Sequence, residues 1–191
     1  MSTILINEEN DVFICGRNSG GQLGLGHNNN VDGFIQIPNF KAILFCKSFH
    51  TIFITEDHDV FVCGYNKYGQ LGLGYHNKIN KLTQIPNFKA ISAYCGDFHT
   101  MFITENYDVF VCGYNFYGQL GLGHYNDVNI PTQIPNFKAI SVSCGKYHTV
   151  FITENYDVFV CGNNSYGQLG LGYIIDEYTP TQIPNFKAIS A

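Results

Sequence analysis

The cysteine–histidine pairs are the first residues in this chain whose types and spacing suit chemistry. A cysteine stands four positions before a histidine three times, at Cys46/His50, Cys95/His99 and Cys144/His148. A zinc site needs four convergent ligands, and each pair supplies two. A Cys–His nucleophile needs a thiol whose pKa the imidazole lowers. Because the pairs recur, we predict structural roles: buried cysteines, and histidines that bond to the backbone of a neighbouring loop.

A glycine-rich phrase, GQLGLG, is the second pattern. It begins at Gly21, Gly69, Gly118 and Gly167. A phosphate loop requires G-x-x-x-x-G-K-[ST], and a dinucleotide turn requires G-x-G-x-x-G between a strand and a helix. GQLGLG has neither spacing and no lysine, and no helix is expected after it to point a positive dipole at a phosphate. We therefore predict that these glycines form turns and bind no cofactor.

Paired carboxylates form the third pattern. They flank expected turns at Glu56/Asp59, Glu105/Asp108 and Glu154/Asp157. Acid–base catalysis needs two carboxylates in environments that separate their pKa values, and exposed turns provide no such difference. We expect solvated turn residues. The chain is therefore predicted to have no catalytic, metal-binding or cofactor-binding residues and not to be an enzyme.

These residues lie on elements that recur with a fixed period. GQLGLG returns at spacings of 48, 49 and 49 residues, and VFVCG or VFICG and IPNFKAI recur with the same spacings. A period of roughly 20–50 residues indicates a solenoid, propeller or array. Within one repeat, HTMFIT and DVFVCG alternate as a strand hairpin, KAISAYCG precedes them, and PTQIP offers a short edge strand limited by proline. Four short antiparallel strands make one propeller blade, so the predicted fold is all-β.

The recurring phrases resemble a known family. VFVCGYNFYGQLGLG, DVNIPTQI and SCGKYHTVFITE resemble the repeat of the regulator of chromosome condensation family, in four copies that cover nearly the whole chain. The resemblance implies a β-propeller, and family members usually have seven blades. The chain departs from the family at the turns, where Asp-Gly is common and Asn106-Tyr107 stands here. It also departs where the family often has tryptophan, at Cys15, Cys63, Cys112 and Cys161.

Residues 1–191 are expected to form a single repeat domain of four blades, with the blade at the chain ends split between both termini. Three architectures are open: a compact four-bladed ring, an open arc, or a fragment of a longer seven-bladed protein. We favour the arc. An arc exposes two apolar blade faces, which predicts self-association.

Composition excludes several classes of partner. The net charge is −5, which gives no basic surface for nucleic acid. No apolar run approaches the roughly 18 residues of a membrane span. The N-terminal MSTILINEEN lacks the positive flank of a signal peptide, and the seven cysteines are therefore expected to be reduced thiols. A cytoplasmic or nuclear location is expected.

The loops that differ between repeats are the expected binding sites, because rigid scaffolds display binding residues on their loops. Two segments vary: the one just before GQLGLG and the one just after it. The alternative is that they merely drifted or pack on the adjacent blade. The candidate partner-binding residues are Tyr65, Lys67, Tyr114, Phe116, Tyr75, His76, Lys78, Tyr125, Ile174 and Ile175.

The predicted function is a non-enzymatic scaffold that binds a still unidentified protein partner through these loops. The resemblance implies an alternative, a guanine-nucleotide exchange factor or regulator of a small GTPase, since the best-known member acts on the GTPase Ran. That activity depends on a complete ring and an inserted wedge, and these repeats of 48 or 49 residues hold no insertion. Chromatin binding is disfavoured by the acidic charge balance.

Overall fold

Each repeat folds into a hairpin of two strands followed by a long outer strand. In DVFVCG, Val109 and Val111 are fully buried and Phe110 between them is half-buried, as a period of two predicts. HTMFI pairs with it in antiparallel register, and Met101 lies opposite Val111. The turn between the two strands holds Tyr107 in a left-handed conformation, with φ 63°.

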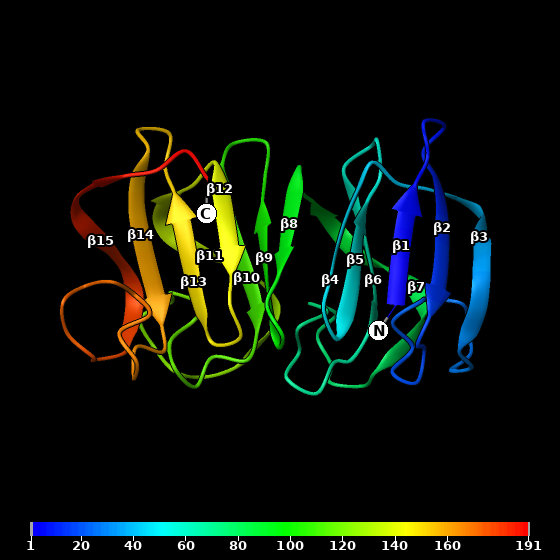
Figure 1. Ribbon diagram of the computed structural model, residues 1–191, viewed down its shortest axis with the longest axis horizontal. Coiled ribbons are helices and arrows are strands. Elements are labelled where there is room, and N and C mark those ends of the chain that lie inside the picture. Colours follow the sequence, from blue (N-terminus) through cyan, green and yellow to red (C-terminus); the bar gives the residue numbers. More distant parts are fainter. Residues whose placement is uncertain (1, 191) are drawn as a thin grey trace.

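The computed structural model describes residues 2–190, in which four antiparallel sheets stand side by side as propeller blades (Figure 1). The first blade has three strands, and each of the other three has four, ordered from the inner to the outer edge. The strands of the four blades in turn are β1 (Ser2–Ile6), β2 (Asp11–Gly16) and β3 (Val31–Lys41); β4 (Leu44–Lys47), β5 (His50–Ile54), β6 (Asp59–Gly64) and β7 (Ile79–Lys89); β8 (Ser92–Cys95), β9 (His99–Ile103), β10 (Asp108–Gly113) and β11 (Val128–Lys138); β12 (Ser141–Cys144), β13 (His148–Ile152), β14 (Asp157–Gly162) and β15 (Glu177–Lys187).

The prediction of an all-β propeller repeat is confirmed, and the arrangement is the open arc. The first and last blades lie at opposite ends of the row, and the sheets do not close into a ring (Figure 1). The first blade has three strands where four were predicted. Within the part of the chain that is described, no helix is long and apolar enough to cross a membrane.

The outer strand is longer than expected. We predicted a short edge strand ended by proline, but β7 runs for 11 residues through Pro86. The register shifts between Asp59 and Phe61, opposite a stretch in which Asn87 adopts a left-handed φ of 54°. Proline has no N–H to donate, and it is tolerated here because β7 is the outermost strand and because the pairing is interrupted at the bulge.

The hydrophobic core lies between neighbouring blades. Ile52, Val62 and Leu71 of the second blade pack with Phe102 and Cys112 of the third. Equivalent clusters join the first blade to the second and the third to the fourth. The fourth blade has beyond these only a small cluster built on Val158, Val160 and Leu169. Each blade is therefore stabilised mainly by the next one in the row.

GQLGLG forms turns, as predicted, and also brings adjacent blades into close contact. Gly69 is left-handed, with φ 81°, and a Cβ there would lie 2.5 Å from the Cα of Asn129 on the next blade. Gly72 is also left-handed, with φ 68°, and a Cβ there would lie 3.2 Å from the Pro131 side chain. Glycine is required at Gly69 for both conformation and space, and at Gly72 chiefly for conformation.

The carboxylates at the hairpin turns are not simply solvated, so that expectation is wrong for the aspartates. Each blade has a lysine at the end of its outer strand that forms a salt bridge with the aspartate at the start of the second hairpin strand. The distances from Nζ to Oδ1 are 2.9–3.3 Å. The same ammonium donates to a turn carbonyl, as Lys138 does to Asn106. The pairs are Lys41–Asp11, Lys89–Asp59, Lys138–Asp108 and Lys187–Asp157.

Two of the seven cysteines are paired, so the expectation of reduced thiols is wrong for them. Cys46 on β4 and Cys95 on β8 form a disulfide between neighbouring inner strands, with 5.8 Å between their Cα atoms. Three of the free cysteines, Cys63, Cys112 and Cys161, are buried. Burial raises the pKa of Cys63 to about 12, so this cysteine is inert as a nucleophile.

A candidate protein-interaction surface

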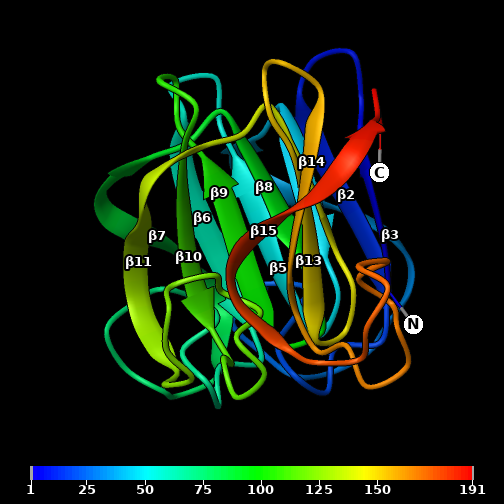
Figure 2. The same cartoon turned by 90° about the vertical axis from the view of Figure 1, so that its left-hand side faces the viewer.

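The variable loops of all four blades lie on one face of the arc, which is the lower side in Figures 1 and 2. The second hairpin strand of each blade ends there at a left-handed glycine such as Gly64 or Gly113. The short turn between the inner strand and the hairpin, which contains Phe49 in the second blade, reaches the same end. The alternating strand directions therefore gather two kinds of loop on one face.

A buried asparagine holds each of the longer loops in shape. The Asn66 amide oxygen accepts a hydrogen bond from the Leu71 N–H at 3.0 Å, and its amide nitrogen donates to the Tyr75 carbonyl at 2.7 Å. Asn115 makes the same two contacts in the third blade. The loops are therefore fixed by their own recurring residues, which leaves the others free to vary.

Eight aromatic side chains form one continuous surface on this face, which we call the aromatic strip. Phe49 stacks on Phe98 of the next blade, with 5.6 Å between ring centroids and 2° between planes. Tyr68 and Tyr114 link the second and third blades at 4.7 Å, and Tyr114 and Tyr147 link the third and fourth at 5.9 Å. The strip consists of Phe49, Tyr65, Tyr68, Phe98, Tyr114, Phe116, Tyr117 and Tyr147.

The strip is accessible and carries positive charge at its margins. Phe116 is 60% exposed and Phe49 is 51% exposed. The ammonium groups of Lys67 and Lys146 lie 5.4 and 4.9 Å from the ring centroids of Tyr68 and Tyr147. Burial, and next the neighbouring tyrosines, raise the pKa of Tyr114, so its hydroxyl remains a hydrogen-bond donor at neutral pH.

The structure places the ten predicted residues in two groups. Tyr65, Tyr114 and Phe116 belong to the aromatic strip, and Lys67 lies against its Tyr68. The other six lie on the loops that follow GQLGLG, and all are exposed: Tyr75, His76, Lys78, Tyr125, Ile174 and Ile175.

Two residues of the second group contact the outer strand of the next blade. The His76 ring nitrogen lies 3.4 Å from the Asn129 amide of the next blade, and Tyr125 lies beside Tyr178, with 6.5 Å between centroids. Ile174 and Ile175, in the last blade, are 68% and 69% exposed. No ring contact among residues 2–190 joins Tyr75 or Tyr125 to the aromatic strip.

Sequence reasoning missed five of the eight residues of the strip. Phe49, Phe98 and Tyr147 stand directly before the repeated histidine, and Tyr68 and Tyr117 directly before GQLGLG. We set recurring residues aside as architectural. Their recurrence as aromatics was nevertheless the signal, because equivalent positions on neighbouring blades lie side by side and merge into one surface.

The recurring histidines are structural, but their partner differs from the one predicted. His50 is buried, and its Nε2 lies 2.7 Å from the hydroxyl of Thr100 on the next blade rather than from a loop backbone. Burial lowers the pKa of His50 to about 3. Among the residues described, no group of three or more His, Cys, Asp or Glu side chains is placed to hold a metal ion.

Four blades of this topology define a β-propeller repeat protein, and the sequence identifies the kind of repeat. Residues 57–103, 108–152 and 157–191 match the family model for the regulator of chromosome condensation (RCC1) repeat. A second model of the same repeat matches residues 43–70, 88–119 and 139–168. The chain belongs to the RCC1 repeat family. No curated protein matches it in sequence.

Solved structures show the same fold. Yeast RCC1 (Prp20) bound to Kap60 superimposes with a TM-score of 0.85 and 22% identity, over 96% of this chain and 47% of that one. Prp20p from Saccharomyces cerevisiae, described with its binding to Gsp1p and histones, gives the same score and identity over 96% and 48%. Human WBSCR16 gives 0.57 and 20%, over 95% and 64%. The chain thus spans about half the length of the Prp20 chains.

Proposed function

We propose that this protein is a non-enzymatic scaffold that binds a protein partner through the aromatic strip. The observation that carries the proposal is the continuity of the strip, which joins eight rings from three blades on one face of a rigid arc. Exposed contiguous apolar patches are uncommon on soluble proteins and mark interaction sites. Tyrosine and other large aromatics carry much of the binding free energy where partners meet.

The loops that hold the strip also suit binding. Asn66 and Asn115 anchor them with buried hydrogen bonds, so little conformational entropy is lost when a partner docks. The stacked rings of Phe49 and Phe98 likewise hold each other in place before binding.

A comparison of two double variants tests the proposal. Tyr65→Ser/Phe116→Ser removes aromatic surface from the strip, and Tyr75→Ser/Tyr125→Ser removes exposed aromatic surface from the same face outside it. Tagged protein of each kind is used to capture partners from extract, which are then quantified by mass spectrometry. Each hot-spot truncation is expected to cost about 2 kcal/mol, or roughly 30-fold in affinity.

We expect a defined set of proteins to be lost from the strip variant and retained by the control. Equal capture by the strip variant and the parent protein would refute the proposal. Melting curves serve as the control for folding, and both variants are expected to melt as the parent does, because the replaced strip side chains are exposed or half-buried.

A second candidate function is regulation of a small GTPase as a guanine-nucleotide exchange factor. The observation that favours it is the fold shared with Prp20p, which was studied for its binding to Gsp1p. A nucleotide-release assay on a panel of small GTPases tests it directly. Accelerated release would place this function above the scaffold role, and unchanged release across the panel would remove it.

A further inference from the structure

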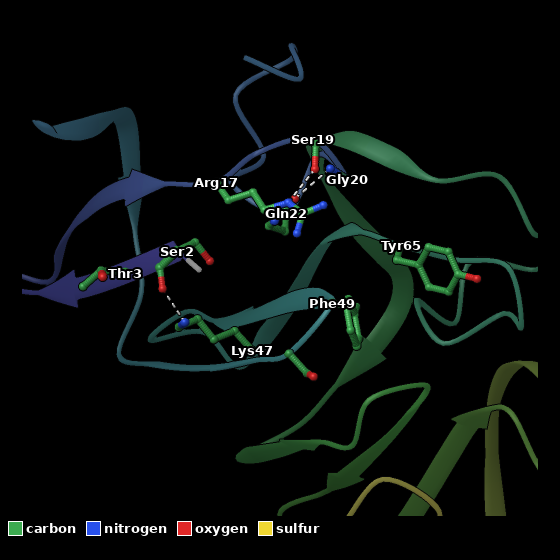
Figure 3. Close-up of a pocket in the computed structure, with 10 residues that line it drawn as sticks. Ser2, Thr3, Arg17, Ser19, Gly20, Gln22, Lys47, Phe49 and Tyr65 are labelled. Carbon is green, nitrogen blue, oxygen red and sulfur yellow. Dashed lines mark hydrogen bonds between the residues drawn. The ribbon is translucent and has the colours of Figure 1, made fainter. Parts of the chain in front are cut away.

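A cavity of about 500 Å³ lies between the first and second blades, at one end of the aromatic strip (Figure 3). Its walls come from both blades: Ser2 and Arg17 from the first, and Lys47, Phe49 and Tyr65 from the second. Phe49 and Tyr65 also belong to the strip, with 6.5 Å between their ring centroids. The cavity therefore opens directly onto the proposed binding surface.

At the cavity, the first blade departs from the repeat at the position of the buried histidine. Ser2 pairs with Gly16 as His50 pairs with Gly64 and His99 with Gly113. In the second and third blades the buried imidazole lies at the boundary with the next blade, within hydrogen-bonding distance of a threonine. The shorter Ser2 side chain lines the cavity at the corresponding boundary.

Two further departures place cations around the cavity. Lys47 stands where the next two repeats have Gly96 and Gly145. Arg17 stands where the later repeats have tyrosine or asparagine, at Tyr65, Tyr114 and Asn163. Three positions that carry histidine, glycine, and tyrosine or asparagine elsewhere thus differ at this one interface.

The charge of the cavity is opposite to that of the whole chain. The chain has a net charge of −5, yet the residues that line the cavity include Arg17 and Lys47 and no acidic residue. The Arg17 Nε donates to the Ser19 hydroxyl at 2.8 Å, and the Lys47 ammonium donates to the Ser2 carbonyl (Figure 3). Both cations retain further N–H donors, because a guanidinium has five and an ammonium three.

We propose that this cavity is a subsite for a carboxylate of the partner protein. The carboxylate belongs to an acidic segment whose apolar side chains lie along the aromatic strip. The inference rests on the proposed scaffold function and adds the chemistry of the partner. A guanidinium and an ammonium with free donors match a carboxylate in charge and hydrogen bonding. The adjoining rings of Phe49 and Tyr65 accept the apolar part of the same segment.

A labelled peptide tests the subsite without knowledge of the natural partner. The probe is a short fluorescein-labelled peptide of alternating glutamate and phenylalanine, and its matched control replaces every glutamate with glutamine. Binding to the full chain is measured by fluorescence anisotropy at low and high salt. We expect the glutamate peptide to bind at least about tenfold more tightly, with an advantage that shrinks as salt rises.

Three variants locate the binding. Arg17→Gln/Lys47→Gln removes both cations, and Ser2→His introduces the residue that stands at this position in later blades. Lys81→Gln, on the outer strand β7, is the matched loss of one exposed charge. We expect the first two to bind the glutamate peptide about tenfold more weakly and Lys81→Gln to bind it as the parent does. Equal binding of the two peptides, or unchanged binding by Arg17→Gln/Lys47→Gln, would overturn the subsite.

Partner capture separates this inference from the scaffold function. If Tyr65→Ser/Phe116→Ser loses partners while Arg17→Gln/Lys47→Gln retains them all, the scaffold function stands and the carboxylate subsite is wrong. If both variants lose the same partners, both proposals are supported. Equal capture by the strip variant and the parent protein counts against the scaffold function itself.

Discussion

The Nε2 atom of His50 lies 2.7 Å from the hydroxyl oxygen of Thr100, and both side chains are fully buried at the boundary between two blades. The Thr100 hydroxyl donates its own proton to the Gln70 carbonyl at 2.7 Å. It must therefore accept a hydrogen from Nε2. Burial keeps the His50 imidazole neutral, so Nδ1 carries no proton, and this nitrogen has no hydrogen-bond partner. His99 and Thr149 repeat the arrangement at 3.1 Å.

This relationship predicts a loss of stability in mild acid. The pKa of His50 is lowered to about 3 by burial, and that of His99 is lowered to about 3 by burial and, to a smaller extent, by the neighbouring histidines. The unfolded chain binds a proton at each histidine near pH 6.5 and the folded chain does not, so the stabilisation is complete above pH 6.5 and is lost as the pH falls towards 3. Between pH 6.5 and 5, each histidine is expected to cost about 2 kcal/mol of unfolding free energy.

Urea denaturation at several pH values measures this effect. His50→Gln/His99→Gln is expected to be less stable at pH 7.5 and to lose less stability on acidification. His27→Gln, which changes an exposed histidine, should follow the parent curve. An acid limb of the same steepness in all three proteins would contradict the assignment.

Gly69→Ala and Gly167→Ala form a matched pair within the same glycine-rich phrase. Both glycines are left-handed, with φ 81° and 73°, so alanine costs about 1 kcal/mol of backbone strain at each. Only Gly69 faces a following blade, where the new Cβ would lie 2.5 Å from the Asn129 Cα, and nothing lies within 4 Å at Gly167. We expect Gly69→Ala to cost about 1–3 kcal/mol more. Equal melting temperatures for the two variants would show that the blades do not pack so closely.

Tyr107→Asn is expected to stabilise the protein. Tyr107 adopts φ 63° at an exposed turn, where asparagine is tolerated better than a bulky side chain. We expect an increase of roughly 0.5–1 kcal/mol in the free energy of unfolding. Tyr166→Asn, at a tyrosine that is 93% exposed and not left-handed, is the control. A decrease at Tyr107 alone would refute the expected gain.

Reduction of the disulfide between Cys46 and Cys95 should lower stability. The bond closes a loop with a sequence separation of 49 residues, for which the chain-entropy estimate is about 4 kcal/mol. Melting temperatures with and without reductant measure the loss, and intact mass confirms the redox state. Cys46→Ala/Cys95→Ala should melt identically in both conditions. A parent protein whose melt ignores the reductant although its mass shows reduction would contradict the stabilising role.

The blades could be predicted because the repeat period and the alternation of apolar residues can both be read directly from the order of residues in the chain. The length of β7 was misjudged, because a left-handed Asn87 lets the strand continue past proline. Asparagine favours that conformation, but the residue pattern does not say whether pairing with the neighbouring strand resumes beyond it. The pairing of Cys46 with Cys95 was missed for another reason. Their spacing of 49 equals the repeat period, and only the distance between adjacent inner strands makes it a contact.

The candidate surface was predictable in part. Tyr65, Tyr114 and Phe116 were selected because their loops differ between blades, whereas Tyr68 and Phe98 were passed over because their positions recur as aromatics. The cavity lies beside Ser2, at a boundary where the second and third blades have a buried imidazole. Such a vacancy emerges only when the neighbouring blade is placed beside it.

The hydrogen bonds between blades join immediate neighbours along the row and run in both directions across a boundary. The Gly74 N–H of the second blade donates to the Asn129 carbonyl of the third, and the Thr100 hydroxyl of the third donates to the Gln70 carbonyl of the second. Thr149 of the fourth blade donates in the same way to the Gln119 carbonyl of the third. Each blade is thus coupled to its immediate neighbours, as in a linear chain of interacting units. Amide exchange should be fastest in the fourth blade, whose own core cluster is the smallest. A partner bound at the second blade would slow amide exchange in the second and third blades and would leave the exchange rates of the fourth blade unchanged.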